Sequence, residues 1–456
     1  MNHKKLISVL LLCSFLLAGC GTQTEPDNSH MMEKSSETLV TEPVSETEIV
    51  SETQKETTEE TIPETENPSA EISLSTGEHN MSTDFQKNQM NLAITLLRRQ
   101  AEQDYDKNLL LSPVSISTAL ALTANGADNS TKIQMEQFFH QDIDSLNTDL
   151  KSYTDNLSSS EFAKCISANS VWIKQTDEIS VREEFLKTGE ETYQAGIFEE
   201  PFDSGTKDKI NSWVSENTDN MIDNIIDDIS PDSVMYLINA LTFDAQWQNQ
   251  YEDYQIEEDT FTAYDGTERT VSMMSSREWG YLDDGNATGF IKPYKEGKYE
   301  FIALLPNEST DIRNYLNTLD SEKLSELLQN PQDFEVDTKL PAFESEYDTS
   351  LKTTLQSMGI ADAFSQESAD FSRMADINNP EKNLYIDDVL HKTYISVDKN
   401  GTKAAAVTAV MVAAVGAAFT EEQEIKEVIL NRPFVYIIAD SEKHLPLFMG
   451  IVTDID

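Results

Sequence analysis

The sequence predicts one large domain of mixed helix and strand over residues 85–456, preceded by a segment that does not fold. Three observations lead to this prediction: a long strand-like segment near residue 402, a series of motifs in a fixed order, and a change of composition near residue 84. A chain of 456 residues, 38% of them hydrophobic, is long enough to bury a sizeable core.

The N-terminus has the pattern of an export signal. Lys4 and Lys5 precede a mostly apolar run over residues 6–17, which is too short to be a good membrane span. An ordinary cleaved signal is one interpretation, but the sequence Leu-Ala-Gly-Cys that ends at Cys20 resembles the processing site of bacterial lipoproteins, and we favour that interpretation. We therefore expect a signal peptide over residues 1–19, a lipid on Cys20, and an extracellular protein anchored to the outer face of the bacterial cell membrane.

The next segment, residues 20–84, is predicted to be a disordered acidic linker. Residues 21–84 carry 16 acidic residues against two lysines and few large apolar side chains, so they cannot bury enough surface to offset the entropy of ordering. Self-repulsion favours an extended spacer, and a tail that binds a basic partner is the alternative. Residues 85–456 hold −37 of the net charge of −49, which argues against nucleic acid as a partner.

The segment that starts at Gly401 is the most informative part of the chain. Between Gly401 and Phe419 there is no proline, and Lys403 is the only charged residue. Because alternate residues of a strand point to opposite faces, one face of this segment can be buried without an unpaired charge, and the segment can be added to the middle of a sheet. The two faces are Thr402, Ala404, Ala406, Thr408, Val410, Val412 and Lys403, Ala405, Val407, Ala409, Met411.

With its flanks, this segment resembles the reactive-centre hinge of the serpins, protease inhibitors that insert a cleaved loop into their own central sheet. Other blocks resemble the family in the same order and together span nearly all of residues 85–456. The blocks are Asn108–Ile116, like its early buried helix; Asn239–Phe243 with Trp247, like its third central strand; Leu340-Pro341, which opens a strand like its sixth; and Arg432–Ile438 with Leu447–Val452, like its C-terminal hairpin.

The resemblance implies an α+β serpin fold with a large central mixed β-sheet, two further sheets, about eight to nine helices and an exposed reactive-centre loop. It also implies a suicide substrate rather than an enzyme: a protease cleaves the loop, an acyl-enzyme forms, and the hinge inserts between two parallel strands before deacylation. The partners would be secreted or host serine proteases, held covalently by a monomer. The implied hinge residues are Gly401, which we expect to provide a bend, and the small residues Thr402, Ala404, Ala405 and Ala406.

Two further sites follow from the resemblance. His391 matches a family histidine in a buried polar cluster, the shutter, under the point where the sheet opens, and the matching partners are Asn239, Ser112 and Ser115. The alternative is a core histidine whose hydrogen bonds are simply satisfied. Trp247 matches the family's breach.

The chain departs from the family in two places. Lys399 stands where serpins usually have a glutamate, and the lysine that would pair with that glutamate is replaced by Ala342. Glu344 and Glu346 are then the candidate partners of Lys399. The second departure is a loop longer by a few residues than in several members, which leaves the position of the scissile bond open.

The family's usual interval from the hinge places the reactive bond at Val415-Gly416. A small aliphatic residue at this position suits the shallow apolar pocket of an elastase-like protease. If the additional loop residues precede the bond, a residue after Val415 would fill the primary pocket of the protease. Phe419 in that position would favour chymotrypsin-like or subtilisin-like enzymes. We favour Val415 and expect trypsin-like proteases least; the alternatives are Ala414, Ala417, Ala418 and Phe419.

No motif for catalysis, a metal or a cofactor is found in the sequence, which lacks G-x-S-x-G, H-E-x-x-H, C-x-x-C and Walker patterns. Cys165 is interpreted as a small buried hydrophobe, because the six histidines offer no arrangement that would activate it. Residues 134–142 lack the basic cluster with which some serpins bind heparin, so we expect no heparin. The alternatives to a serine protease inhibitor are a non-inhibitory binding or folding-helper serpin and a cross-class inhibitor of papain-like cysteine proteases.

Overall fold

The computed structural model describes residues 82–104, 106–157, 160–230, 232–402 and 424–455. The chain divides into two units, Met1–Leu74 and Ser75–Asp456, and all described residues belong to the second. The predicted signal, the lipidation site Cys20 and nearly all of the predicted linker lie outside the described residues, as does the loop over residues 403–423.

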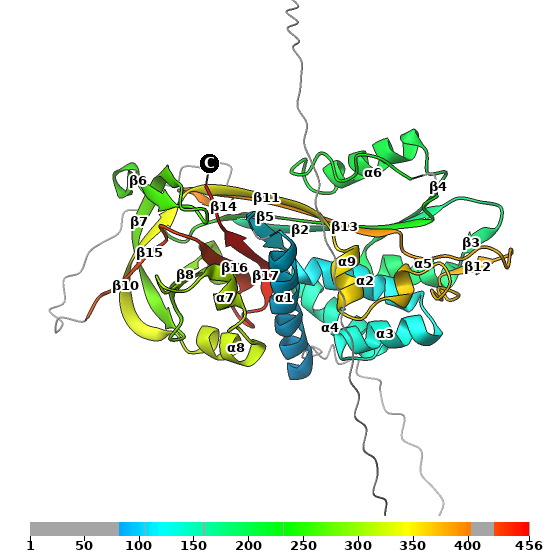
Figure 1. Cartoon of the computed structure of the whole chain (residues 1–456), viewed down its shortest axis with the longest axis horizontal. Helices are drawn as coiled ribbons and strands as arrows, with labels where there is room; N and C mark the ends of the chain where they lie inside the picture. Colours follow the sequence, from blue (N-terminus) through cyan, green and yellow to red (C-terminus); the bar gives the residue numbers. More distant parts are fainter. Residues whose placement is uncertain (1–81, 105, 158–159, 231, 403–423, 456) are drawn as a thin grey trace, which may run out of the picture. The chain divides into compact units, whose positions relative to one another are not determined.

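Nine α-helices occur in the described part of the chain (Figure 1). Helix α2 is buried over all but its last residue, as expected for a helix whose residues are mostly apolar or small on every side. The helices are α1 (Thr83–Gln103), α2 (Pro113–Asn125), α3 (Asn129–Phe139), α4 (Ile143–Asn156), α5 (Glu183–Tyr193), α6 (Ser204–Glu216), α7 (Ile312–Leu316), α8 (Ser321–Gln329) and α9 (Lys352–Ser357), with 3₁₀ turns at Asp253–Gln255, Lys295–Gly297 and Asp362–Phe364.

A six-stranded mixed sheet contains the predicted hinge. Its strand order is β11 (Phe343–Ser350), β13 (Asp388–Val397), β14 (Gly401–Thr402), β5 (Met235–Gln246), β2 (Ala163–Lys174) and β4 (Gly196–Glu200). Along β13 buried and half-buried residues alternate, which is the pattern of a strand with one face in the core. Helix α6 covers one face of β2 and β5, and α2 packs against the other (Figure 1).

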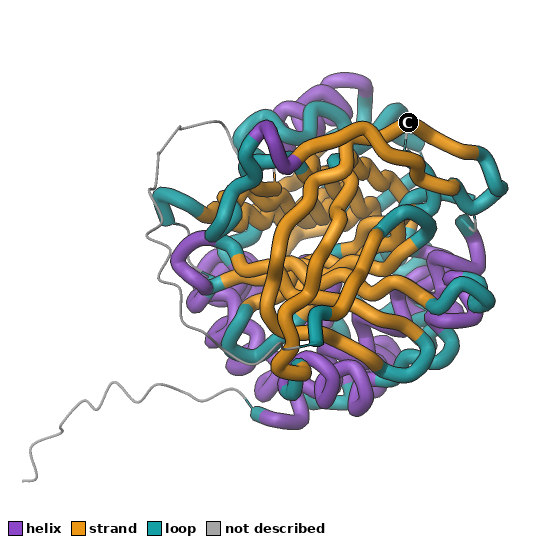
Figure 2. The backbone as a smooth tube through the Cα atoms, turned by 90° about the vertical axis from the view of Figure 1, so that its left-hand side faces the viewer, coloured by secondary structure: helices purple, strands orange, loops and turns teal. Residues whose placement is uncertain are grey.

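A nine-stranded sheet forms the second layer, and strands occupy the centre of the view in Figure 2 with helices around them. Its pairs are antiparallel except β10 with β15. The strands in order are β1 (Leu109–Leu111), β17 (Pro446–Val452), β16 (Phe434–Asp440), β9 (Tyr299–Pro306), β8 (Ala287–Pro293), β7 (Glu268–Asp283), β10 (Gln332–Pro341) and β15 (Lys426–Ile429), and β6 (Ile256–Thr262) pairs with β7; a two-stranded sheet joins β12 (Ala375–Ile377) to β3 (Ile179–Val181).

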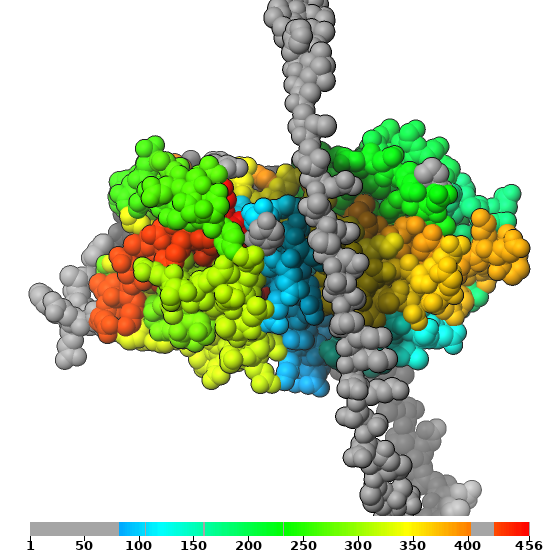
Figure 3. All heavy atoms as spheres, viewed as in Figure 1, coloured from blue at the N-terminus to red at the C-terminus, as the bar shows by residue number. Residues whose placement is uncertain are grey.

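The core joins the two larger sheets through a single large cluster of buried hydrophobic residues, and a smaller cluster lies under α6. Helix α1 packs beside α7 and α8, and Figure 3 shows it in blue between them and the rest of this face. Among the described residues, no helix is long and apolar enough to cross a membrane.

The mixed class predicted from the sequence is confirmed, and the blocks at Asn239–Phe243 and Arg432–Val452 form the expected strand β5 and hairpin β16–β17. Two expectations are corrected. Leu340-Pro341 does not open a strand but ends β10, and β11 begins at Phe343. Residues 109–111 form strand β1 rather than helix, and α2 begins at Pro113, because Ser112 is extended and its hydroxyl accepts a hydrogen bond from the Ser115 amide.

Candidate functional site

The first two hinge residues already lie inside the six-stranded sheet. Thr402 is opposite Val397 of β13 and Ala245 of β5, and β14 runs antiparallel to both strands. Below this point β13 and β5 pair directly with each other in parallel. The structure therefore shows the hinge at one end of a seam between two parallel strands, toward the left of the view in Figure 1. The remaining hinge residues and every candidate for the reactive bond lie outside the described residues: Ala404, Ala405, Ala406, Ala414, Val415, Gly416, Ala417, Ala418 and Phe419.

Gly401 is required for close approach rather than for a bend. It is not among the glycines with a positive φ, so its backbone conformation is open to other residues. A Cβ atom at this position would overlap the carbonyl oxygen of Ala245, and it would lie 2.8 Å from the Cα of Gln246. The expectation that Gly401 supplies a bend is therefore wrong, because the glycine lets the hinge lie directly against β5.

Thr402 is fully buried. Its hydroxyl lies 2.5 Å from the hydroxyl of Tyr294, which is also fully buried. Thr402 is therefore in place before any cleavage, and insertion of the loop would continue from Lys403 rather than begin at Thr402.

Trp247, predicted as the breach residue, holds the turn before the hinge. Its indole Nε1 donates to the carbonyl of Asp398 at 2.8 Å, and its backbone amide donates to the carbonyl of Asn400 at 2.9 Å. The indole stacks on Tyr294, with ring centroids 4.5 Å apart and an angle of 12° between the planes. One buried tryptophan thus contacts both the turn and the tyrosine that bonds Thr402.

The partner of Lys399 is Asp253, at 2.6 Å. The Asp253 carboxylate raises the pKa of Lys399 through a hydrogen bond and its charge. Glu344 instead accepts a hydrogen bond from Ser396, and Glu346 pairs with Lys392 at 2.8 Å. The expectation that Glu344 or Glu346 compensates Lys399 is therefore wrong, because the lysine reaches the segment after β5 and not β11.

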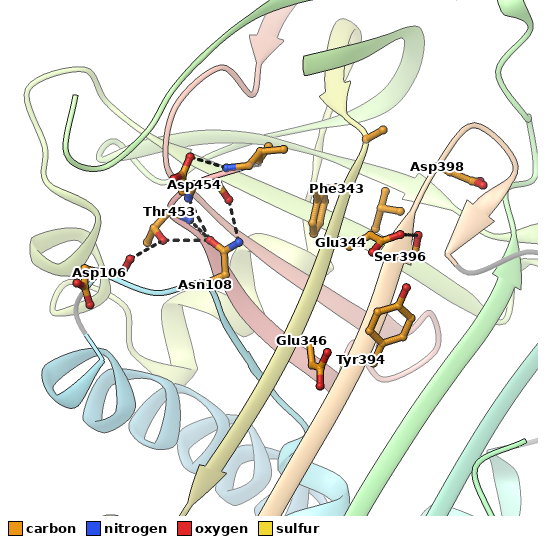
Figure 4. Close-up of a pocket in the computed structure, with 13 residues that line it drawn as sticks. Asp106, Asn108, Phe343, Glu344, Glu346, Tyr394, Ser396, Asp398, Thr453 and Asp454 are labelled. Atoms are coloured by element: carbon orange, nitrogen blue, oxygen red, sulfur yellow. Dashed lines mark hydrogen bonds between the residues drawn. The ribbon is translucent and has the colours of Figure 1, made fainter. Parts of the chain in front are cut away.

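Glu344 and Glu346 line a surface cavity of about 890 Å³ beside the edge strand β11 (Figure 4). The cavity extends from the hinge turn at Asp398 to the C-terminal residues Thr453–Ile455. Among the described residues that line it there are five carboxylates and no lysine or arginine. Figure 4 shows the hydrogen bonds between Asn108 and the C-terminal residues at one side and Glu344 with Ser396 at the other.

The four residues predicted for the shutter lie together in one buried cluster. His391 and Asn239 are directly opposite each other in β13 and β5, and His391 Nδ1 is 2.5 Å from Asn239 Oδ1. The backbone amide of Ser112 donates to His391 Nε2 at 3.2 Å, and Asn239 Nδ2 donates to Ser115 Oγ at 2.5 Å. All four are buried at 1% exposure or less.

Two members of this cluster were missed by the sequence reasoning. Asn239 Nδ2 also donates to Asn169 Oδ1 at 2.6 Å, and Asn169 Nδ2 donates to Ser167 Oγ at 2.9 Å. Both residues belong to β2, where Asn169 is opposite Asn239. The sequence held a signal for Asn169 alone, a polar residue close before the apolar run Val171–Ile173; Ser167 is exposed in the structure.

His391 is neutral in the folded protein. Because its Nε2 accepts from the Ser112 amide, its proton is on Nδ1 and is donated to Asn239. Burial lowers the pKa of His391 to about 3, because the charged form would lose its hydration there. The cluster therefore links the two strands of the seam by a hydrogen bond without charge.

Cys165 lies in β2 and packs against the core, but it is half-buried rather than buried as expected. Burial raises the pKa of its thiol to about 12, so the thiol is protonated and weakly nucleophilic at neutral pH. In the described part of the chain, no group of three or more histidine, cysteine, aspartate or glutamate side chains is arranged to hold a metal ion.

Comparisons with known proteins agree with this geometry. The family model described as "Serpin (serine protease inhibitor)" matches residues 87–455. The chain is 31% identical to human Serpin B4 over 383 residues, which are 78% of this chain and 95% of that protein. It is similar to the crystal structure of the thermophilic serpin tengpin in its native state, with a TM-score of 0.78, 41% identity and coverage of 82% of this chain and 95% of that one.

The chain therefore belongs to the serpin family, and the expected serpin fold is confirmed. The latent state of tengpin gives a TM-score of 0.72 at 38% identity, covering 83% of this chain and 99% of that one. The fold is thus more similar to the native than to the latent state of the same relative.

We expect the buried His391 to make the stability of the fold depend on pH. The folded-state pKa of His391 is about 3 against 6.5 in a free side chain, so below pH 6.5 the unfolded chain binds a proton that the folded protein does not. We expect the urea midpoint to fall as pH is lowered from 7 to 5, and the His391→Gln variant to show a shallower fall.

His444→Gln is the matched control. Glu300 raises the pKa of His444, so this histidine stabilises the fold below pH 6.5, and its contribution is lost as pH rises through the raised value. Its removal should make the fall toward pH 5 steeper. Equal pH slopes for the wild type and His391→Gln would show that His391 takes up a proton in the folded state.

Proposed function

We propose that this serpin inhibits serine proteases as a suicide substrate, with cleavage of the loop followed by its insertion between β13 and β5. The observation that supports this most directly is the position of β14, which already separates the upper ends of these strands. The serine hydroxyl of the protease would attack the carbonyl carbon of the reactive bond, form an ester with it, and release the amine of the C-terminal fragment. The ester-bound end would then move with the inserting strand.

The register of β14 predicts where each loop residue would go. Because β14 is antiparallel to both neighbours, each later loop residue would lie opposite residues one position earlier in β13 and in β5. Six steps from Thr402, which is opposite Val397 and Ala245, bring Thr408 opposite His391 and Asn239. The Thr408 hydroxyl would face the cluster, since it has the same parity as the inward-facing Thr402. This hydroxyl would offer a new hydrogen bond at the place where insertion breaks the hydrogen bond between His391 and Asn239.

The same register gives the displacement of the protease. Lys403–Val415 is 13 residues long, or about 43 Å when extended at ~3.3 Å per residue. Val415 would then pass Asp388, where β13 begins, and an ester at Val415 would carry the protease to the opposite end of the sheet. For the reactive bond itself we keep Val415-Gly416, which suits an elastase-like protease; Phe419 would suit a subtilisin-like one.

Insertion is tested with elastase and two arginine variants of the loop. Ala406 has the parity of Thr402, so its side chain would be buried on insertion, whereas Ala405 has the opposite parity. Burying an unpaired arginine costs about 2 kcal/mol or more, which slows insertion roughly 30-fold and lets deacylation win. We expect an SDS-resistant complex from the wild type and Ala405→Arg, and mostly cleaved, uncomplexed inhibitor from Ala406→Arg.

These two variants carry the same charge at adjacent positions, so steric effects on cleavage are matched. Both proteins should be cleaved by elastase at similar rates. A wild-type protein that is cleaved without forming any complex would show a non-inhibitory serpin, and equal complex yields from the two variants would show that insertion does not limit trapping.

Specificity is tested by Val415→Arg. A shallow apolar pocket rejects a long cation, whereas the acidic pocket of a trypsin-like protease binds it through a charge-assisted hydrogen bond. We expect inhibition to move from elastase to trypsin by at least about 100-fold in the ratio of association rates. Sequencing of the released fragment identifies the bond; continued inhibition of elastase with cleavage mapped beyond Ala417 would move the assignment to Phe419.

We further propose that the protein is a lipoprotein held at the outer face of the membrane through Cys20. The proposal is supported by the apolar run and the Leu-Ala-Gly-Cys sequence at residues 17–20. The expected result is incorporation of labelled palmitate and recovery in the membrane fraction for the wild type, with both lost in Cys20→Ser. Release of unlabelled wild-type protein into the medium would indicate an ordinary cleaved signal.

A further inference from the structure

A buried ion pair lies beneath the turn that precedes the hinge. Lys292 of β8 and Glu278 of β7 form it, with Nζ and Oε1 2.6 Å apart. Their side chains are only 1% and 5% exposed. Taking two charges out of water costs free energy that their attraction repays only when the geometry is good, and an apolar pair of the same volume often stabilises a fold as well. Stability alone therefore does not account for this pair.

The ammonium contacts the two residues that hold the hinge turn. Lys292 Nζ is 5.5 Å from the ring centroid of Trp247 and 4.3 Å from that of Tyr251, within the range of cation–π attraction. Both aromatic residues are buried, and both follow β5. Charge and aromatic rings thus meet in a site from which water is excluded, where such contacts are strongest.

Those two residues bind every carbonyl of the turn. Trp247 donates to Asp398 through its indole and to Asn400 through its amide, at 2.8 and 2.9 Å. The amide of Tyr251 donates to the carbonyl of Lys399 at 2.9 Å. Three consecutive carbonyls, immediately before β14, are therefore held by the two residues against which Lys292 packs.

The carboxylate end of the pair closes the network. Ser276 Oγ donates to Glu278 Oε1 at 2.6 Å and lies 3.0 Å from Thr338 Oγ1 of β10. The same hydroxyl is 3.4 Å from the hydroxyl of Tyr251. Tyr251 is thus contacted by the ammonium on its ring and reached by the serine at its hydroxyl, so its position is fixed from both ends.

We propose that Lys292 and Glu278 form a positioning pair, which holds Trp247 and Tyr251 so that the turn 398–400 presents β14 to the seam in the correct register. The proposal rests on the proposed function, because register matters when Lys403 must be the next residue to enter. If the turn is loosened, β14 leaves the sheet part of the time, insertion starts late, and a larger share of acyl-enzyme is hydrolysed before it is trapped.

The test compares Lys292→Met, the double variant Glu278→Gln/Lys292→Met, and the control Arg277→Met. Arg277 is on the same strand as Glu278, but it pairs with Asp337 on an exposed face. Lys292→Met leaves a buried unpaired carboxylate and lowers global stability, whereas the double variant contains neither charge and separates stability from positioning.

The first measurement is hydrogen exchange of the uncleaved proteins, which does not depend on inhibition. We expect the amides of residues 247, 251 and 401–402 to exchange about tenfold faster in both Lys292 variants, because neither retains a cation on the rings. The amides of β13 below the turn should keep wild-type rates in the double variant. Wild-type protection of the turn in the double variant, or equal acceleration throughout the fold, would overturn the positioning role.

The second measurement is the number of inhibitor molecules consumed per protease trapped. We expect it to rise about fivefold or more in the double variant and to stay at the wild-type value in Arg277→Met. If the turn amides exchange faster but the number of inhibitor molecules consumed is unchanged, the claim that the pair acts on insertion is wrong. Absence of any complex from the wild type would refute the proposed function, and hydrogen exchange would still decide whether the pair positions the turn.

Discussion

The parallel pairing of β13 with β5 is the constraint on which the rest of the arrangement depends. Seven register pairs, from Asp388 with Tyr236 to Tyr394 with Thr242, close the sheet below the hinge. Above them β14 forms antiparallel pairs with both strands. Each further loop residue that enters would exchange part of one parallel ladder for parts of two antiparallel ladders, and antiparallel pairing is the more stable per residue. On the proposed mechanism the closed seam would therefore be the less stable of two ways to complete the same sheet.

A seam that opens as we propose is best held by contacts that are specific but not strong. A neutral histidine bonded to an asparagine meets this need, since it fixes the register of β13 against β5 and carries no charge that would have to be separated. Asn239 keeps its bonds to Ser115 and Asn169 on the β5 side, so opening leaves few donors unpaired. Within this side-chain cluster the bond between His391 and Asn239 is the one that would be broken, and the register we propose would bring the hydroxyl of Thr408 to that position.

The sequence predicted the strands, the buried helix and the shutter partners. Each of them lies in a short motif whose residue types favour one local structure. Prediction from the sequence failed where the answer depends on register between segments far apart in the chain. The sequence alone could not show that Thr402 is already buried, since this depends on how β14 meets Ala245, 157 positions earlier. The need for glycine at position 401 and the ion pair between Lys399 and Asp253 also depend on contacts with residues far earlier in the chain.

The turn before the hinge lacks the glutamate–lysine pair that the serpin resemblance implies, because Lys399 and Ala342 stand at those two positions. Lys399 with Asp253 is exposed at 44% and 88%, and such pairs contribute about 0–1 kcal/mol and are screened by salt. That pair is too weak to fix the turn. Trp247 and Tyr251 make the directional bonds to the turn, and they in turn need something to keep their rings in place. A buried ammonium held by Glu278 contacts both rings and is not screened by salt, so on our proposal the turn depends on the residues beneath it rather than on its exposed ion pair.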